Sequence, residues 1–119
     1  MRYLLIIASD PTLPSPEPGD PEFDAYMKGW TDYDEELTAA GAFVAGEALL
    51  PTETATTVRH KEGATHVIDG PFVELKEHLG GFYLIDVDTL DDAIEWVRKL
   101  PVGEGAVEVR PIMDLSAFM

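Results

Sequence analysis

The chain has 119 residues, 45% of them hydrophobic, and its 23 acidic and 8 basic side chains give a formal net charge of −15. That length and composition predict one globular domain over residues 1–119, and the acidic excess argues against nucleic acid as a partner because phosphate contacts need clustered Lys and Arg. The sequence has no cysteine, which excludes disulfides, thiolate metal sites and a cysteine nucleophile and makes the cytoplasm the expected location.

The charge also bears on membranes and ligands. An anionic membrane surface is disfavoured, and the sequence has no run of about 18 apolar residues that could span a bilayer. The negative charge itself has two interpretations. One is solubility alone, and the other is attraction of a cationic ligand or a basic protein partner.

The first expected element is a strand over residues 2–8. Its apolar side chains occupy both odd and even positions, which predicts burial on both faces of a sheet. The same short run resembles a weak signal peptide, but its β-branched residues and the proline-rich segment that follows favour a strand. Residues 11–19 should form a loop that either lies across the domain or moves.

The first helix is expected between Asp20, which can cap it, and Gly41, which ends it. Charged residues, among them Asp34, are expected on its outer face. The aromatic side chains of its inner stripe either pack in the core or line a ligand site. This stripe recurs at steps of three and four residues and comprises Phe23, Tyr26, Met27, Trp30, Tyr33, Leu37 and Ala40.

The middle of the chain predicts a strand followed by a hairpin. Residues 42–50 form the strand, which the charge of Glu47 interrupts. Residues 54–59 and 64–68 pair across a polar turn. The segment Asp69-Gly70-Pro71 is a turn by composition, and residues 72–79 form a loop or one helical turn.

The third main strand is expected over residues 80–87. Phe82 and Leu84 fall on one face and Tyr83 and Ile85 on the other, so both faces are apolar. The pair Gly80-Gly81 at its start predicts a bulge or a close approach of backbones.

The last two elements are a helix and a strand. Thr89 is placed to cap the helix, and Pro101 stops it. Residues 106–113 predict a strand with one polar side, as suits the edge of a sheet.

This order of elements predicts an α+β fold. It is the ferredoxin-like βαββαβ arrangement with an inserted β-hairpin, in which both helices cover one face of an antiparallel sheet. Two helices leave the other face open, although two strands are apolar on both faces. A second copy of the sheet is the simplest cover, so a homodimer packed sheet against sheet is expected.

Several separated segments resemble one protein family. Asp69-Gly70-Pro71-Phe72 resembles the signature of the DGPF group within the YCII-related proteins. The sequence over residues 74–85 is similar to the usual continuation of that signature. Residues 44–47, 54–59 and 105–111 resemble further segments of the family in the same order, so the resemblance covers nearly the whole chain.

The resemblance implies a dimeric α+β barrel, close in architecture to muconolactone isomerase-like folds. For YCII-type members it implies an enzymatic role inferred from a His–Asp pair in a cleft, and for some relatives an association with extracytoplasmic-function sigma factors. This sequence departs from that pattern, because His60, His66 and His78 do not fall in the first half of the chain. Leu75 and His78 also replace residues expected in the block, commonly Thr and Gln.

The candidate site consists of charges that interrupt apolar segments near the signature. Asp69 and Glu47 are the candidate catalytic carboxylates, and the candidate ligand-binding residues are Arg59, Lys76, His78 and Arg110. In a functional interpretation, a carboxylate of raised pKa transfers a proton while Arg or Lys holds an anionic group. In a structural interpretation, Asp69 caps its own turn and the others form ion pairs at the sheet edge. Histidine spacing predicts no metal site, and no cofactor motif is present.

Two functions follow as hypotheses. The first is a protein that binds a small molecule in a cleft beside the Asp69–Phe72 turn, and whose chemistry, if it has any, is cofactor-free proton transfer of the isomerase or lyase kind. The second is a non-catalytic binding or regulatory module, linked through its relatives to extracytoplasmic-function sigma factors. The sequence leaves open whether the protein is an enzyme.

Overall fold

The computed structural model describes residues 1–72 and 77–119. The elements in chain order are β1 (Arg2–Ser9), α1 (Phe23–Ala39), β2 (Phe43–Ala48), the 3₁₀ turn η1 (Thr52–Thr54), β3 (Thr56–Lys61), β4 (Ala64–Asp69), β5 (His78–Asp86), α2 (Leu90–Arg98), β6 (Gly105–Pro111) and the 3₁₀ turn η2 (Leu115–Phe118).

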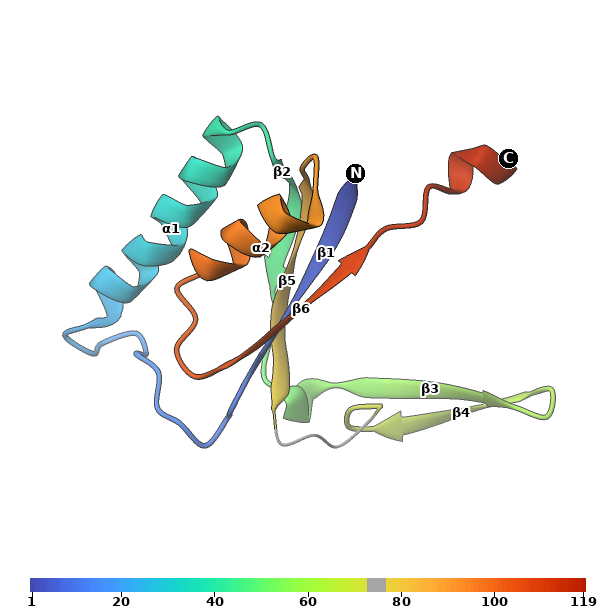
Figure 1. The fold of residues 1–119 in the computed structure, drawn as a ribbon. Helices are drawn as coiled ribbons and strands as arrows, with labels where there is room; N and C mark the ends of the chain where they lie inside the picture. Colours follow the sequence, from blue (N-terminus) through green and yellow to red (C-terminus); the bar gives the residue numbers. More distant parts are fainter. Residues whose placement is uncertain (73–76) are drawn as a thin grey trace.

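Four strands form one antiparallel sheet in the order β2-β5-β1-β6, and β3 pairs with β4 as a separate hairpin. Both helices lie on the same side of the four-stranded sheet (Figure 1). The predicted ferredoxin-like α+β fold with an inserted hairpin is therefore confirmed. The polar-sided strand β6 lies at an edge of the sheet, as its alternation predicted.

The face of the sheet that the helices cover, here called the closed face, carries the core. Leu5 and Ile85 are 0% exposed, and Tyr3, Ile7 and Tyr83 are also buried. Apolar residues of the helices and loops complete the core, namely Tyr33, Leu37, Ala42, Ala93 and Leu100.

The opposite face, here called the open face, carries no helix. By alternation along β1 and β5 it presents Leu4, Ile6, Ala8, Phe82 and Leu84, all of them half-buried. The sequence correctly assigned Phe82 and Leu84 to one face and Tyr83 and Ile85 to the other.

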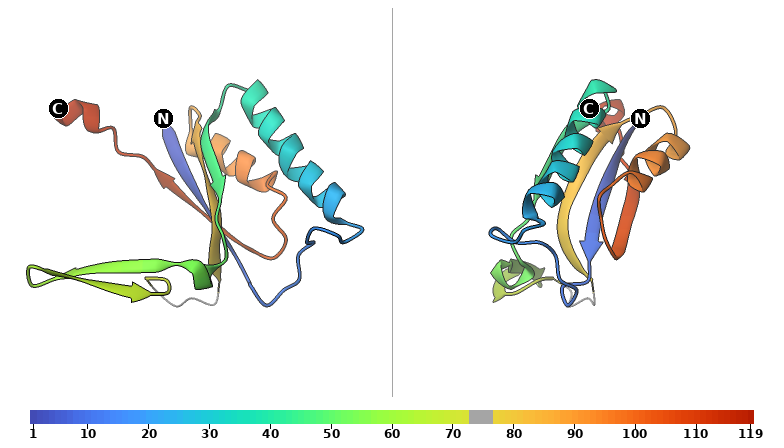
Figure 2. Two further views of the ribbon diagram at one scale, coloured as in Figure 1. Left: turned by 180° about the vertical axis from the view of Figure 1, so that it is seen from behind. Right: turned by 90° about the vertical axis from the view of Figure 1, so that its left-hand side faces the viewer.

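Two segments extend beyond the open face, on the side away from the helices (Figures 1 and 2). One is the hairpin of β3 and β4, here called the arm, and the other is the chain after β6. Every residue of β4 is exposed. The radius of gyration is 16.7 Å, whereas a compact chain of this length would have about 13.5 Å. The arm and the chain after β6, here called the tail, account for the extended shape.

The sequence predicted a bulge or a close approach of backbones at Gly80 and Gly81, and the structure contains both. The register between β1 and β5 steps from Ile7–Gly81 to Ala8–Leu79, so Gly80 forms a bulge. A Cβ atom on Gly81 would lie 2.7 Å from the Glu47 carbonyl oxygen, whereas one on Gly80 would meet nothing within 4 Å. The close approach of backbones is therefore at Gly81.

The helix ends follow the sequence signals except at one position. Thr89 Oγ1 accepts a hydrogen bond from the Asp92 N–H at 3.1 Å, and Gly41 has the positive φ of 73° expected after a helix. The prediction that Asp20 caps α1 is wrong, because the helix begins at Phe23. Asp20 instead accepts a hydrogen bond from the Glu17 N–H at 2.8 Å, within the turn that precedes the helix.

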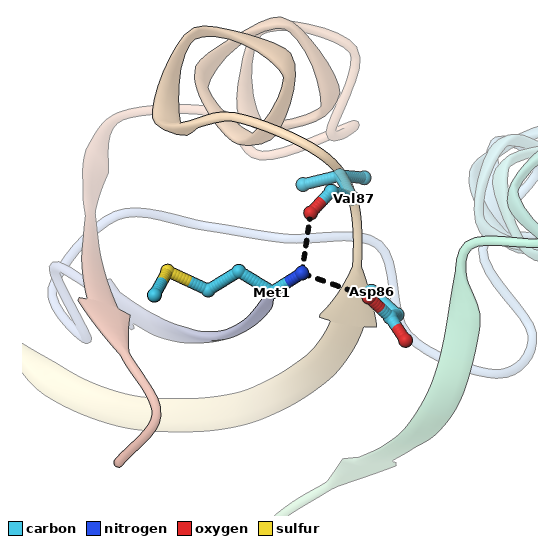
Figure 3. Close-up of polar contacts among 3 residues, drawn as sticks. All are labelled: Met1, Asp86 and Val87. Carbon is cyan, nitrogen blue, oxygen red and sulfur yellow. Dashed lines mark hydrogen bonds and ion pairs between the residues drawn. The ribbon is translucent and has the colours of Figure 1, made fainter. Parts of the chain in front are cut away.

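The start of β1 is attached to the end of β5. The Met1 ammonium donates to the Val87 carbonyl oxygen at 3.0 Å and lies 3.3 Å from Asp86 Oδ1 (Figure 3). Among the described residues, no helix combines the length and the apolar content needed to cross a membrane.

Candidate functional site

A cavity of about 910 Å³ lies between α1, the closed face of the sheet and two loops. One loop is the proline-rich segment, of which residues 9–11 and 13–16 line the cavity, and the other spans residues 101–104. The proline-rich segment therefore lies across the domain, which was one of its two expected roles. The sheet contributes residues 46–48 of β2 and 80–83 of β5.

The lining is rich in aromatic side chains. Tyr26 and Trp30 of α1 meet edge to face with ring centroids 6.5 Å apart. Phe43 of β2 and Tyr83 of β5 meet in the same way at 6.3 Å. The inner stripe of α1 thus serves both expected roles. Tyr33 and Leu37 are buried in the core, whereas Tyr26 and Trp30 border the cavity.

The main polar pair of the cavity joins α1 to the sheet. The Tyr83 hydroxyl donates a short hydrogen bond to Asp34 Oδ1, and both residues line the cavity. Gly46 on the neighbouring strand makes room for the Tyr83 ring, since a Cβ atom there would lie 2.7 Å from Tyr83 Cδ1. A glycine on β2 therefore allows Tyr83 to take the position from which it reaches Asp34.

Burial raises the pKa of the Tyr83 hydroxyl well above its usual range, and the hydrogen bond to Asp34 and the charge of that carboxylate raise it further. Burial likewise raises the pKa of Tyr33, which packs edge to face against Tyr83 and donates to the Trp96 carbonyl oxygen at 3.0 Å. At neutral pH both hydroxyls are therefore protonated donors.

One of the two predicted catalytic residues belongs to the lining of this cavity. Glu47 is exposed on the edge strand β2 and belongs to the lining, but it pairs with Phe82, so by alternation its side chain lies toward the open face. The other, Asp69, is exposed at the end of β4 in the arm. The lining of the cavity therefore includes Glu47 and does not include Asp69.

The predicted ligand-binding residues also lie on separate elements. Arg59 is in β3, with its guanidinium 5.2 Å from the centre of the Phe72 ring. His78 begins β5 and is half-buried. Arg110 is exposed on β6, with Nη1 3.2 Å from Glu108 Oε1. Lys76 falls outside the described residues.

Two residues of the cavity were not predicted as site residues. Asp34 was assigned to the outer face of the first helix, and this is wrong because it accepts from Tyr83 across the cavity. Its spacing carries the signal, since Tyr26, Trp30 and Asp34 follow one another at steps of four and share one side of the helix. Tyr83 was assigned to the correct face of its strand, but nothing in the sequence identified its hydroxyl as a partner of a carboxylate.

The chemistry available in the cavity is that of carboxylates, a phenol and aromatic rings. Within residues 1–72 and 77–119, no group of three or more His, Asp or Glu side chains is arranged to hold a metal ion. A carboxylate beside a protonated hydroxyl can exchange protons with a bound molecule, and the rings can bind its apolar part.

Comparison with known proteins shows the family. The model of the YCII-related domain matches residues 1–116 of the chain. An uncharacterized protein of Rhizobium meliloti (strain 1021) is 36% identical over 115 residues, which cover 94% of this chain and 92% of that protein. The resemblance noted in the segments around Asp69–Phe72 thus extends over nearly the whole chain, and the protein belongs to the YCII-related domain family.

Proposed function

We propose that this protein binds a small organic molecule in the cavity between α1 and the closed face of the sheet. The observation that carries the proposal is the cavity itself, whose volume of about 910 Å³ is bordered by two edge-to-face aromatic pairs and by the hydrogen-bonded pair of Tyr83 and Asp34. Ligand sites combine apolar walls with a few polar groups in this way. The cavity reaches residues 80–83 of β5, the strand that follows the Asp69–Phe72 turn in the sequence.

We propose further that the bound molecule undergoes proton transfer without a cofactor, as in an isomerase or a lyase. Asp34 is the candidate base, since it belongs to the lining and accepts from Tyr83 on the closed face, and Glu47 stays a proposed site residue at the edge of the sheet. In an isomerisation, such a carboxylate takes a proton from one atom of the ligand and returns it to another, so the protein ends unchanged. The protonated Tyr83 hydroxyl donates a hydrogen bond to the carboxylate of Asp34 and holds it in place.

Protein-observed NMR with a library of aromatic and aliphatic fragments tests the binding. The two tryptophans make this readout specific, because Trp30 lines the cavity and Trp96 lies outside it. We expect fragments that shift the Trp30 indole N–H signal and leave that of Trp96 in place. Ala48→Phe, which fills part of the lining, should abolish these shifts, whereas Ala106→Phe on β6 should not. A library in which no fragment moves the Trp30 signal would contradict the proposal.

Asp69 stays a proposed site residue, and a conservative substitution separates its two interpretations. Asp69→Asn keeps the size of the side chain and removes its charge. If Asp69 serves binding, the variant keeps the melting temperature of the parent and loses affinity for the fragments found above. If Asp69 serves only its own turn, the melting temperature falls and the affinity of the folded fraction is unchanged.

We also propose that the protein is a cytoplasmic homodimer in which two open faces pack together as a dimeric α+β barrel. The apolar residues Leu4, Ile6, Phe82 and Leu84 supply the contact, and the arm and tail extend on the same side. The arm adds exposed apolar surface at Val67, which is 70% exposed. Light scattering coupled to size exclusion at micromolar concentration should give twice the mass of the chain, and a purely monomeric mass would rule this dimer out.

A further inference from the structure

The charges that border the cavity have one sign. The acidic residues of the lining are Asp10, Asp34, Glu47 and Glu104, and within the described part of the chain the lining contains no lysine or arginine. Glu47 pairs with Phe82, so by alternation its side chain lies toward the open face and the other three residues are the acidic ones considered below. Five of the described basic side chains have partners elsewhere. Lys28, Lys99, Arg98 and Arg110 each form an ion pair with a carboxylate outside the lining, and Arg59 stacks on Phe72.

The aromatic rings of the cavity favour the same kind of ligand as the carboxylates. A cation placed over the face of a Trp or Tyr ring is attracted by the electrons of that face, and aromatic cages bind ammonium groups on this principle. Trp30 and Tyr26 present two rings at an interplanar angle of 79°, so their faces point in different directions around one region of the cavity. This arrangement lets a compact cation contact one ring face while it remains near a carboxylate.

The wider field of the protein adds to this preference. The chain carries a net charge of −15, and a cleft lined by one sign of charge concentrates ligands of the opposite sign. Glu104 is exposed and belongs to the lining, so an approaching ligand meets its charge before it reaches the rings. An anionic ligand would have to approach against this field, with none of the described Lys or Arg residues in the lining to receive it.

We propose that the cavity selects a small organic cation, namely an amine or quaternary ammonium compound that carries an apolar group. The ammonium group lies near Asp34 and Glu104 and over the rings of Tyr26 and Trp30, and the apolar group contacts Leu13. This inference rests on the proposed function, because it names the ligand class of the same cavity. It reverses the charge of the ligand that Arg59 and Arg110 led the sequence analysis to expect.

Three probes of similar size and different charge test the inference. They are 2-phenylethylammonium, 2-phenylethanol and 3-phenylpropanoate, each titrated against the protein at low ionic strength while the Trp30 and Trp96 indole signals are followed by NMR. We expect the Kd read from Trp30 to be lowest for the cation and at least about tenfold higher for the anion, which corresponds to ~1.4 kcal/mol. The difference should shrink as salt is added, because screening weakens exposed charges.

Neutral substitutions of the carboxylates test which charges matter. Glu104→Gln and Asp34→Asn should each raise the Kd of 2-phenylethylammonium by about two- to fivefold and leave that of 2-phenylethanol unchanged, as expected for partly exposed charges. Glu35→Gln is the matched control, since it removes one negative charge from α1 beside Asp34 but lies outside the lining. If Asp34→Asn disturbs folding through Tyr83, Glu104→Gln carries the test.

The outcomes separate this inference from the proposed function. If the three probes bind equally, or if the anion binds best, the cavity is a ligand site and the preference for a cation is overturned. An effect of Glu35→Gln equal to that of Glu104→Gln would also overturn it, because the preference would then belong to the net charge of the protein. If no probe moves the Trp30 signal while the fragment library does, the cation inference alone fails. If neither does, both proposals fail.

Discussion

The two faces of strands β1 and β5 carry similar apolar side chains and have different surroundings. On the closed face, Leu5 and Ile85 are fully buried beneath the helices. On the open face, Leu4 and Leu84 pair directly across the strands and remain half-buried. The same two strands therefore carry a fully buried core on one side and a half-buried apolar surface on the other.

This difference shows what apolar patterning does and does not specify. The hydrophobic effect requires that both faces leave water, but it does not say which partner covers each. In this chain the helices cover one face, and the open face is where we propose that a second copy packs. The predictions below compare the faces, from the largest expected effect to the smallest.

The largest effect is expected in the closed core. Leu5→Ala removes a side chain that is 0% exposed, and it should lower the free energy of unfolding by ~2–5 kcal/mol. Leu4→Ala on the open face is the matched control and should cost much less in an isolated monomer. Urea denaturation at low protein concentration measures both. Equal losses would mean that the two faces are equally well covered in one chain.

The open face should respond to charge through assembly. Leu84→Glu places a carboxylate opposite Leu4 and should give a folded monomer, because a charge buried without a partner costs several kcal/mol, in the range of ~3–5. Light scattering reports the mass, and circular dichroism reports the fold. Thr31→Glu on the exposed side of α1 should leave the dimer intact. A Leu84→Glu dimer would place the interface elsewhere.

The glycine pair separates a close contact from a bulge. Gly81→Ala directs a methyl group at the Glu47 carbonyl 2.7 Å away, and the backbone shift that follows should cost ~1–3 kcal/mol. Gly80→Ala meets open space and should change the free energy of unfolding by less than ~1 kcal/mol. Thermal unfolding of the two variants gives the comparison. Similar melting temperatures would show that the backbone of β2 shifts at little cost in free energy.

Alkaline pH should weaken the closed face. Burial raises the pKa of Tyr33 in the folded state, so its contribution to stability is complete below the unfolded pKa of about 10 and is lost as the pH rises above that value. Tyr33→Phe should lessen the fall of the unfolding free energy with rising pH, although it loses the hydrogen bond to Trp96 at all pH values. If the unfolding free energy of Tyr33→Phe falls above pH 10 as steeply as that of the parent, the raised pKa of Tyr33 is contradicted.

The smallest effect is expected on the outer surface of the helices. Lys99 Nζ lies 2.6 Å from Glu36 Oε1 and joins α2 to α1, but both side chains are about half exposed. Glu36→Gln should lower the unfolding free energy by less than ~1 kcal/mol and only at low salt. A larger loss in denaturation experiments would mean that this ion pair helps to hold the helices on the closed face.

Local signals were enough to predict the fold. The alternation in residues 82–85, the cap at Thr89 and the positive-φ glycine at position 41 each depend on neighbours in sequence, and each was confirmed. Asp20 does not cap the helix, because its carboxylate accepts a hydrogen bond from the Glu17 N–H in the preceding turn. Competing local hydrogen bonds of this kind leave little trace in composition.

The candidate site was predicted less well because it depends on contacts between distant residues. Glu47 stands out as a charge in an apolar strand, and the residue belongs to the lining of the cavity, but its side chain lies toward the open face. Asp34 pairs with Tyr83 across 49 positions of sequence, and no local pattern specifies such a pair. Arg59 and Asp69 seemed close to Glu47 along the predicted elements, yet they belong to the separate hairpin of β3 and β4 and neither lines the cavity.

The arm is closed at its own base. The Gly70 N–H donates to the Ala55 carbonyl at 2.8 Å, and Thr57 Oγ1 donates to the Gly70 carbonyl at 2.7 Å, so the chain leaves and returns at nearly one point. Residues 56–69 could therefore be excised and Ala55 joined to Gly70 through a short splice, without changing the connectivity of the four-stranded sheet. The arm is in this sense a modular insertion. It can be lengthened, exchanged or deleted while the four-stranded sheet keeps its strand order.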